Sequence, residues 1–133
     1  MDEAKKVLIV EDSATVKYEV GLLLKQLGIT PLPAGGELGL FGQIEQYGKL
    51  VDLIIMDLTL KHENGFELIK KLKETPKYDQ IPVVILTEHA DINSVLTAKK
   101  LGVAGYIRKP IKRDEFIRKI KEAMLLYEED DLL

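Results

Sequence analysis

The chain has 133 residues, of which 46% are hydrophobic and 31% are charged, so it can bury the core of one globular domain, and we expect no second domain. No apolar run approaches the roughly 18 residues that span a bilayer, residues 1–6 lack a signal-peptide pattern, and the absence of cysteine excludes disulfides, thiol catalysis and thiolate metal sites. The net charge of −3 argues against direct nucleic-acid binding, and we expect a cytoplasmic protein with no membrane contact.

The first part of the chain alternates strand and helix patterns. Residues 6–10 (KVLIV) are a short β-branched run, and a helical stripe of apolar residues follows over residues 16–27. Residues 29–33 (ITPLP) indicate an edge strand, because two prolines cannot donate to a central ladder. Residues 34–50 carry five glycines among apolar residues and predict a weakly patterned second helix.

The alternation continues to the end of the chain. Residues 51–57 (VDLIIMD) are an apolar run that ends in an acid, which is typical of a strand buried on both faces. A third helix is expected to open near Asn64-Gly65 and to end before Pro76. The remaining predicted elements are a strand at 81–87, a helix at 91–101, a strand at 105–109, a helix at 114–127 and an acidic tail at 128–133. The folded core should therefore extend from about residue 5 to residue 127.

Five strands alternating with five helices predict an α/β fold with a doubly wound parallel sheet. Because the carboxyl ends of parallel strands share one edge, the residues that end these strands should converge there. They are Glu11, Asp12, Asp57, Thr87 and Lys109. Three crowded carboxylates repel one another unless a cation joins them, and an all-oxygen site suits Mg²⁺. With a hydroxyl and a mobile positive charge beside it, such a site is equipped to bind a phosphoryl group.

Each of these residues also has a simpler interpretation when it is taken alone. Glu11 and Asp12 are favourable charges before a helix, and Asp57 is a common turn residue. Thr87 suits a strand, and Lys109 suits solvent. It is their joint occurrence, in order and at the strand ends, that favours a site.

The pattern resembles the receiver domains of two-component response regulators, over essentially the whole chain. The pair Glu11-Asp12 is similar to the metal-binding pair of the family, and Asp57 after the apolar run is similar to its phosphoacceptor. Other residues also fall at the family's spacing, namely Gly65, Thr87, Tyr106 and Lys109-Pro110. The resemblance implies a flavodoxin-like strand order of 2-1-3-4-5 and a cis peptide bond between Lys109 and Pro110.

The resemblance also implies a mechanism. Asp57 would accept a phosphoryl group from a phosphohistidine on a sensor histidine kinase or a phosphotransfer protein, and the chain would catalyse only its own phosphorylation and dephosphorylation. Mg²⁺ would be held by Asp12, Asp57, the backbone carbonyl of Thr59, and Glu11 through water. Lys109 and Thr87 would contact the phosphoryl oxygens, and Tyr106 would turn inward as a switch. A downstream output protein or domain would read the change, and a homodimer through the fourth helix, fifth strand and fifth helix is a further expectation.

Two residues depart from the family pattern. Lys61 stands where the family usually has proline, and Glu88 follows Thr87 where the family prefers a small residue. An added carboxylate at Glu88 is expected to slow phosphorylation or to restrict the donors that reach Asp57. Thr59 and His89 occupy positions that tune phosphate lifetime in the family, while the side chains of His62 and His89 are expected to be exposed in loops.

Other functions fit the sequence less well. A haloacid-dehalogenase-like phosphatase would need a second Asp where Thr59 stands, and in a flavodoxin-like FMN carrier the pair Glu11-Asp12 would repel the phosphate. A receiver-like interaction module that is rarely or never phosphorylated is the serious alternative, because of Glu88. The end of the chain soon after the last helix fits both a single-domain regulator and a piece of a longer one.

Overall fold

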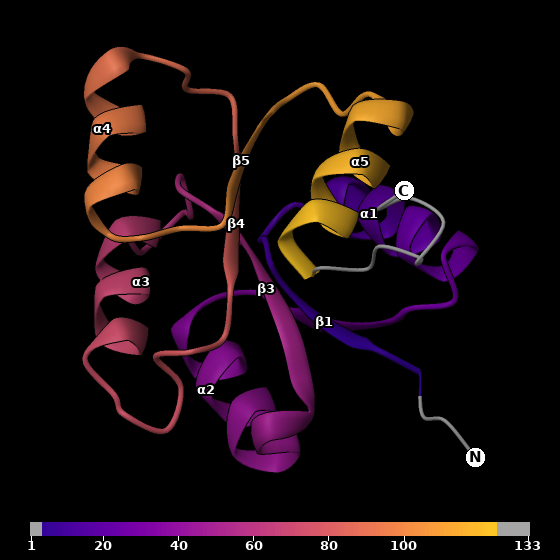
Figure 1. The fold of residues 1–133 in the computed structure, drawn as a ribbon, viewed down its shortest axis with the longest axis horizontal. Helices are drawn as coiled ribbons and strands as arrows, with labels where there is room; N and C mark the ends of the chain where they lie inside the picture. Colours follow the sequence, from indigo (N-terminus) through magenta and orange to yellow (C-terminus); the bar gives the residue numbers. More distant parts are fainter. Residues whose placement is uncertain (1–3, 125–133) are drawn as a thin grey trace, which may run out of the picture.

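The computed structural model describes residues 4–124 and has the expected α/β fold (Figure 1). One five-stranded parallel sheet has the order β2-β1-β3-β4-β5, as the flavodoxin-like resemblance implied. Its strands are β1 (Lys6–Val10), β2 (Thr30–Ala34), β3 (Val51–Asp57), β4 (Val83–Thr87) and β5 (Gly105–Arg108). The helices are α1 (Ala14–Gln26), α2 (Glu37–Tyr47), α3 (Gly65–Lys73), α4 (Ile92–Lys100) and α5 (Arg113–Met124), with a short 3₁₀ helix, η1 (Gly48–Leu50).

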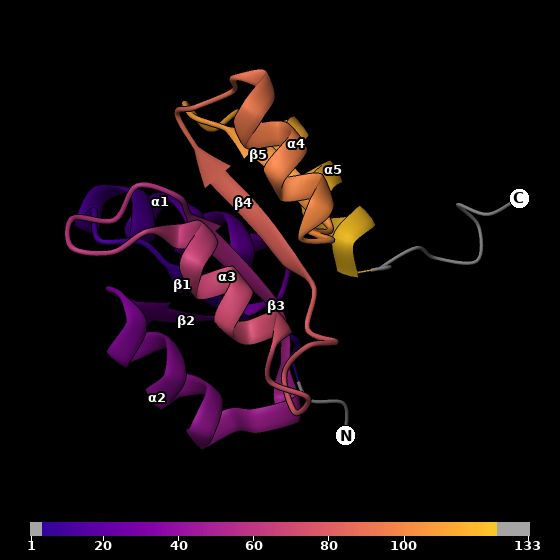
Figure 2. The ribbon, with the colours of Figure 1, turned by 90° about the vertical axis from the view of Figure 1, so that its left-hand side faces the viewer.

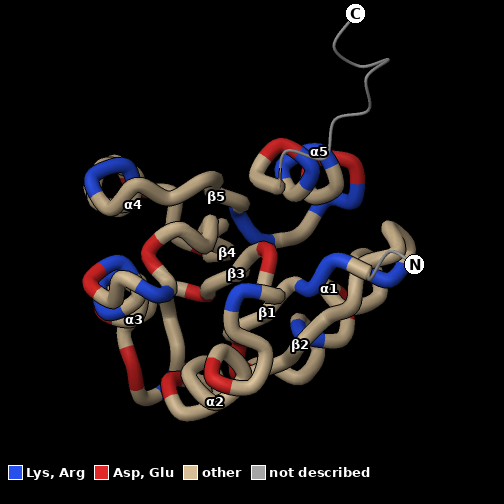
Figure 3. The backbone as a smooth tube through the Cα atoms, turned by 60° about the horizontal axis from the view of Figure 1, so that its bottom comes forward, with Lys and Arg blue, Asp and Glu red and all other residues tan. Residues whose placement is uncertain are grey.

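Helices cover both faces of the sheet. Figure 2 looks onto the face covered by α2, α3 and α4, and α1 and α5 lie behind it. Strand β3 shows why both faces need cover, since Ile54 and Met56 pack in the cluster with α2 and α3, whereas Leu53 and Ile55 pack with α1 and α5. The continuous apolar run of β3 is therefore explained by burial on both sides. Lys, Arg, Asp and Glu are mixed along the outer helices α3 and α5 (Figure 3).

Several predicted boundaries differ from the structure by one or two residues. Strand β2 begins at Thr30 instead of residue 29, and β4 begins at Val83 instead of residue 81. Strand β5 ends at Arg108 instead of residue 109. The N–H of Lys109 still donates to Thr87 O, but the pairing cannot continue because Pro110 lacks an N–H. Residues 125–127 of the predicted last helix and the tail at 128–133 lie outside the described residues.

The glycine-rich stretch does form the second helix, over a shorter range than the predicted 34–50. Leu40 and Ile44 lie one turn apart on α2 and are fully buried against the sheet. Tertiary burial of this kind outweighs the low helix propensity of glycine. None of the helices within residues 4–124 has both the length and the apolar character needed to cross a bilayer.

Gly65, the first residue of α3, is required by a close approach of two backbones. A Cβ atom at this position would lie 2.3 Å from the carbonyl oxygen of Asp57 and 2.7 Å from Leu58 Cα. The N–H of Gly65 also donates to Leu58 O at 3.1 Å, so the start of α3 is joined to the end of β3. The absence of a side chain at Gly65 thus sets the path of the loop that follows Asp57.

We expect Gly65→Ala to lower the free energy of unfolding by about 1–3 kcal/mol, because backbone atoms must move to admit the new methyl group. Gly42→Ala in α2 is the matched control, since a Cβ there has no neighbour within 4 Å. The control should instead stabilise by about 0.5–1 kcal/mol through helix propensity. Urea unfolding of both variants measures the difference, and equal effects would contradict the close approach.

Candidate functional site

The sheet edge at the carboxyl ends of the strands brings together the residues expected there. Glu11 and Asp12 follow β1, Asp57 ends β3, Thr87 ends β4, and Lys109 follows β5. Strands β1, β3 and β4 are neighbours in the sheet, so their ends are adjacent. Glu11, Asp57 and Thr87 are the buried polar residues among those described, at 1%, 4% and 0% exposure. Burial of two acids at one edge is costly, and it points to a built site.

The three acids form a cluster that suits a divalent cation. One carboxylate oxygen from each of Glu11, Asp12 and Asp57 lies within 4.8 Å of the others. Hard oxygen ligands in this number, beside a cavity that admits water, fit Mg²⁺. The cavity has a volume of about 210 Å³, and Thr59 lines it together with the acids.

Backbone N–H groups orient each carboxylate. Glu11 Oε1 accepts from the N–H of Ser13 at 3.1 Å, and Asp57 Oδ1 accepts from the N–H of Thr59 at 3.1 Å. Asp12 Oδ2 accepts from the N–H of Lys61 at 2.6 Å. One oxygen of each acid is thereby held by a backbone N–H, and Glu11 Oε2 also accepts from Lys109 Nζ. The contact from Lys61 was missed from the sequence, because it uses a backbone group that every residue except proline carries.

Lys109 supplies the positive charge of the site. Its Nζ lies 2.9 Å from Glu11 Oε2 and 3.7 Å from Asp57 Oδ2. Burial by itself would lower the pKa of Lys109, but the bond to Glu11 and the charge of Asp57 raise it above the ordinary value. The ammonium group therefore stays protonated at neutral pH. The Lys109–Pro110 peptide bond is cis, in agreement with the resemblance.

Asp57 has the most perturbed environment of the acids. Burial raises the pKa of Asp57 from 3.8 to about 6, and the nearby charge of Glu11 acts in the same direction. The N–H of Thr59 and the charge of Lys109 oppose this change. In the absence of a cation, the ionised form of Asp57 is thus disfavoured by the fold, and a bound cation would relieve that cost.

The side chains of Thr87 and Tyr106 both form hydrogen bonds with the backbone of His89. The N–H of His89 donates to Thr87 Oγ1 at 3.1 Å, and the hydroxyl of Tyr106 donates to the carbonyl oxygen of His89 at 2.6 Å. Tyr106 is half-buried, and the side chains of His62 and His89 are exposed, as expected. The loop between β4 and α4 therefore connects a site residue to the aromatic residue of β5. Sequence reasoning did not identify this use of the backbone of His89.

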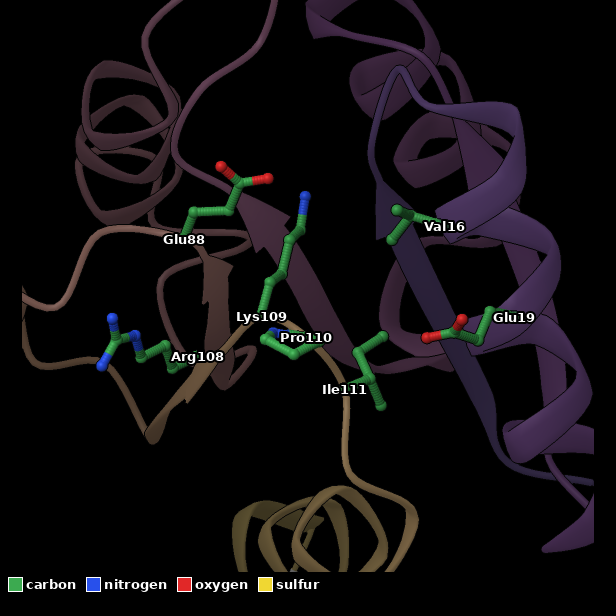
Figure 4. A pocket seen from close by; sticks show the side chains of 7 residues that line it. All are labelled: Val16, Glu19, Glu88, Arg108, Lys109, Pro110 and Ile111. Atoms are coloured by element: carbon green, nitrogen blue, oxygen red, sulfur yellow. The ribbon is translucent and has the colours of Figure 1, made fainter.

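Glu88 lies between the site and a neighbouring pocket. It lines the cavity of the acidic cluster, and it also lines an adjoining pocket of about 510 Å³ between α1 and the start of the β5–α5 loop. Figure 4 shows the carboxylate of Glu88 and the ammonium group of Lys109 extending in the same direction, with Val16 and Glu19 across the pocket on α1. Glu88 is an exposed residue, so its carboxylate adds a solvent-accessible negative charge to the lining of the cavity.

We predict that Asp57→Asn stabilises the metal-free protein at neutral pH. Because the folded-state pKa of Asp57 is about 6 and its ordinary value is 3.8, the cost of ionising it in the fold grows as the pH rises from about 4 to about 6 and then stays constant. At pH 7 the free energy of unfolding should increase by about 1–3 kcal/mol, whereas at pH 4 it should change little. Urea unfolding in the presence of a chelator measures both values. An equal gain at the two pH values would contradict the burial cost.

Comparisons with known proteins agree with this geometry. Residues 7–121 match the family described as the response regulator receiver domain. The chain is 31% identical over 121 residues to the phosphate regulon transcriptional regulatory protein PhoB of Escherichia coli, covering 91% of this chain and 52% of that protein. It therefore spans about half the length of PhoB.

Two further proteins are similar along most of their length. The chemotaxis protein CheY homolog of Campylobacter jejuni is 30% identical over 124 residues, which cover 90% of this chain and 92% of that protein. The receiver domain of the sensor histidine kinase PA1611 from Pseudomonas aeruginosa, which has a magnesium ion coordinated in its active site cleft, shares the fold with a TM-score of 0.80 at 21% identity, covering 92% and 98% of the two chains. The chain belongs to the response regulator receiver domain family of two-component signal transduction.

Proposed function

We propose that this chain is a signalling switch in which Asp57 accepts a phosphoryl group with the help of Mg²⁺. The observation that carries the proposal is the buried Asp57 itself, which shares a 4.8 Å cluster with Glu11 and Asp12 while Lys109 Nζ lies 3.7 Å from its carboxylate. The donor is a phosphohistidine on a sensor histidine kinase or a phosphotransfer protein. The magnesium ion in the PA1611 receiver domain supports the metal assignment.

Each residue then has a role in the transfer. An oxygen of Asp57 forms a bond to phosphorus as the bond to the donor nitrogen breaks, and the imidazole leaves as a neutral ring that keeps the bonding electron pair and the proton on its other nitrogen. Asp12, Asp57, the carbonyl of Thr59 and, through water, Glu11 would hold Mg²⁺, whose charge offsets that of the transferring group. Lys109 keeps its ammonium group beside Asp57 and pairs with a phosphoryl oxygen.

The proposed response passes through the β4–α4 loop. When Thr87 Oγ1 turns to a phosphoryl oxygen, it releases the N–H of His89, and the carbonyl of the same residue holds the hydroxyl of Tyr106. Tyr106 then turns inward, and the surface formed by α4, β5 and α5 changes. On this surface, Ile92 is 73% exposed and Leu96 is 48% exposed, which suits contact with an output partner or a second copy.

The proposal also covers where the chain acts and what it contacts. It acts in the cytoplasm as one receiver domain, without direct contact to nucleic acid or membrane, and its only chemistry is its own phosphorylation and dephosphorylation. Glu88 is the observation that favours a second candidate function, a receiver-like interaction module that is rarely phosphorylated, because its carboxylate lines the cavity that a donor must enter.

Incubation with acetyl phosphate and Mg²⁺ tests the switch directly. We expect intact-mass spectrometry to show the gain of one phosphoryl group, because Asp57 is the acceptor beside the cluster and Lys109. Asp57→Asn and a chelated sample are the controls, and both should show no gain. A folded wild-type protein that binds Mg²⁺ but gains no mass would leave either a donor-selective site narrowed by Glu88 or the interaction module, and a panel of histidine kinases would separate the two.

We expect Glu88→Ala to raise the initial rate of phosphorylation by acetyl phosphate about 2- to 5-fold, since it removes a like charge from the path of an anionic donor. The gain should shrink as ionic strength rises. Glu19→Ala is the matched control, because Glu19 lines the adjoining pocket but not the cavity of the acidic cluster. A rate unchanged by Glu88→Ala would show that Glu88 does not restrict access to Asp57.

A further inference from the structure

The loop between β3 and α3 is fastened to the start of α2 by Glu63. Both carboxylate oxygens of Glu63 accept from the backbone N–H of Glu37, at 2.9 and 3.0 Å. Glu37 is the first residue of α2, and the residue before it, Gly36, has no side chain that could cap the helix. Glu63 therefore does for α2 what a capping side chain ordinarily does, but it reaches from a different part of the chain.

Two other residues belong to this attachment. A Cβ atom on Gly36 would lie 2.2 Å from Glu63 Oε1, so glycine at that position leaves the space that the carboxylate occupies. The side chain of Glu37 forms an ion pair with Lys71 of α3. The first turn of α2 is thus held by the loop and by α3, and neither contact was foreseen from the sequence.

The same loop contacts the acidic cluster on its other side. Two positions before Glu63, the N–H of Lys61 donates to Asp12 Oδ2 at 2.6 Å. The base of the loop is closed by a bridge between Thr59 and Asn64, and Leu60 is buried in the core. The outer part of the loop is therefore held at two points. Glu63 holds it to α2, and the N–H of Lys61 holds it to Asp12.

We propose that Glu63 is a positioning residue for the acidic cluster. By fastening the loop to α2, Glu63 keeps the N–H of Lys61 against Asp12 Oδ2, and this bond fixes the orientation of the Asp12 carboxylate beside Glu11 and Asp57. Groups that orient a metal ligand from outside are important for affinity, and Glu63 acts on Asp12 through one intervening backbone group. The part of this proposal that concerns Mg²⁺ affinity rests on the proposed function, while the part that concerns the bond from Lys61 to Asp12 does not.

The first test compares Glu63→Ala and Glu63→Gln with the wild-type chain. In metal-free protein, NMR should show an upfield shift of the Lys61 amide proton in Glu63→Ala, because its bond to Asp12 lengthens. The Kd for Mg²⁺, measured by calorimetric titration, should rise about 3- to 10-fold. Glu63→Gln keeps one acceptor oxygen for the N–H of Glu37 and should lie between Glu63→Ala and wild type in both measurements. Glu67→Ala, which removes a nearby exposed charge from α3, should leave both measurements at the wild-type value.

The second test breaks the attachment from the α2 side and leaves Glu63 in place. Gly36→Ala puts a methyl group where the carboxylate lies, so it should reproduce the changes at the Lys61 amide and in the Kd for Mg²⁺. Gly35→Ala is its matched control, since a Cβ at Gly35 has no neighbour within 4 Å. Agreement between Gly36→Ala and Glu63→Ala, with Gly35→Ala at the wild-type value, would support the proposal.

One result would overturn the proposal. If Glu63→Ala and Gly36→Ala lower the thermal stability of the protein but leave the Lys61 amide and the Kd for Mg²⁺ unchanged, Glu63 only caps α2. Failure of the proposed function gives a different result, because the wild-type protein would then bind no Mg²⁺. In that case the Lys61 amide in metal-free protein would still show whether Glu63 positions the loop.

Discussion

The burial of acids at one edge of the sheet is the constraint on which the rest of the site depends. Glu11 and Asp57 are buried beside Asp12, and burial, together with the charge of Glu11, disfavours the ionised form of Asp57. The fold offsets this cost with the ammonium group of Lys109 and with one backbone N–H for each acid. The part of the cost that these groups do not offset appears as the raised pKa of Asp57, and burial is its largest cause. A site in which ionisation of an acid remains unfavourable in the absence of a cation is suited to binding a cation.

The topology of the sheet is what makes this crowding possible. Asp57 belongs to the central strand β3, and the acids after β1 lie at the end of its neighbour. Lys109 comes from beyond β5, at the far edge of the sheet, and it reaches Glu11 across the ends of β4 and β3. A long, flexible lysine side chain suits that span, since a short cation at this position could not contact two acids that follow other strands.

Most residues of the site could be predicted from the sequence because each of them ends an apolar run or follows one directly. Asp57 ends the run VDLIIMD, Thr87 ends the run IPVVILT, and the pair Glu11-Asp12 follows KVLIV. Side-chain type and position were therefore enough to predict that these residues lie together. The bond from Lys61 to Asp12 and the junction at His89 use backbone groups, which have no signature in the letters of a sequence. The exact ends of β2 and β4 likewise depended on ladder bonds around proline and not on hydrophobic pattern.

Helix α2 shows how a locally unfavourable sequence is made to fold by the site that it borders. Its glycines lower its helix propensity, and it is held by the burial of Leu40 and Ile44 and by the carboxylate of Glu63. The contact of Glu63 comes from the loop that also orients Asp12 through Lys61, so the start of α2 and the acidic cluster share one support. Under the proposal that Glu63 positions Asp12, linkage requires that a group which strengthens this support at one end strengthens it at the other. Binding of a cation at the cluster and ordering of the first turn of α2 are therefore expected to be coupled, although no residue belongs to both.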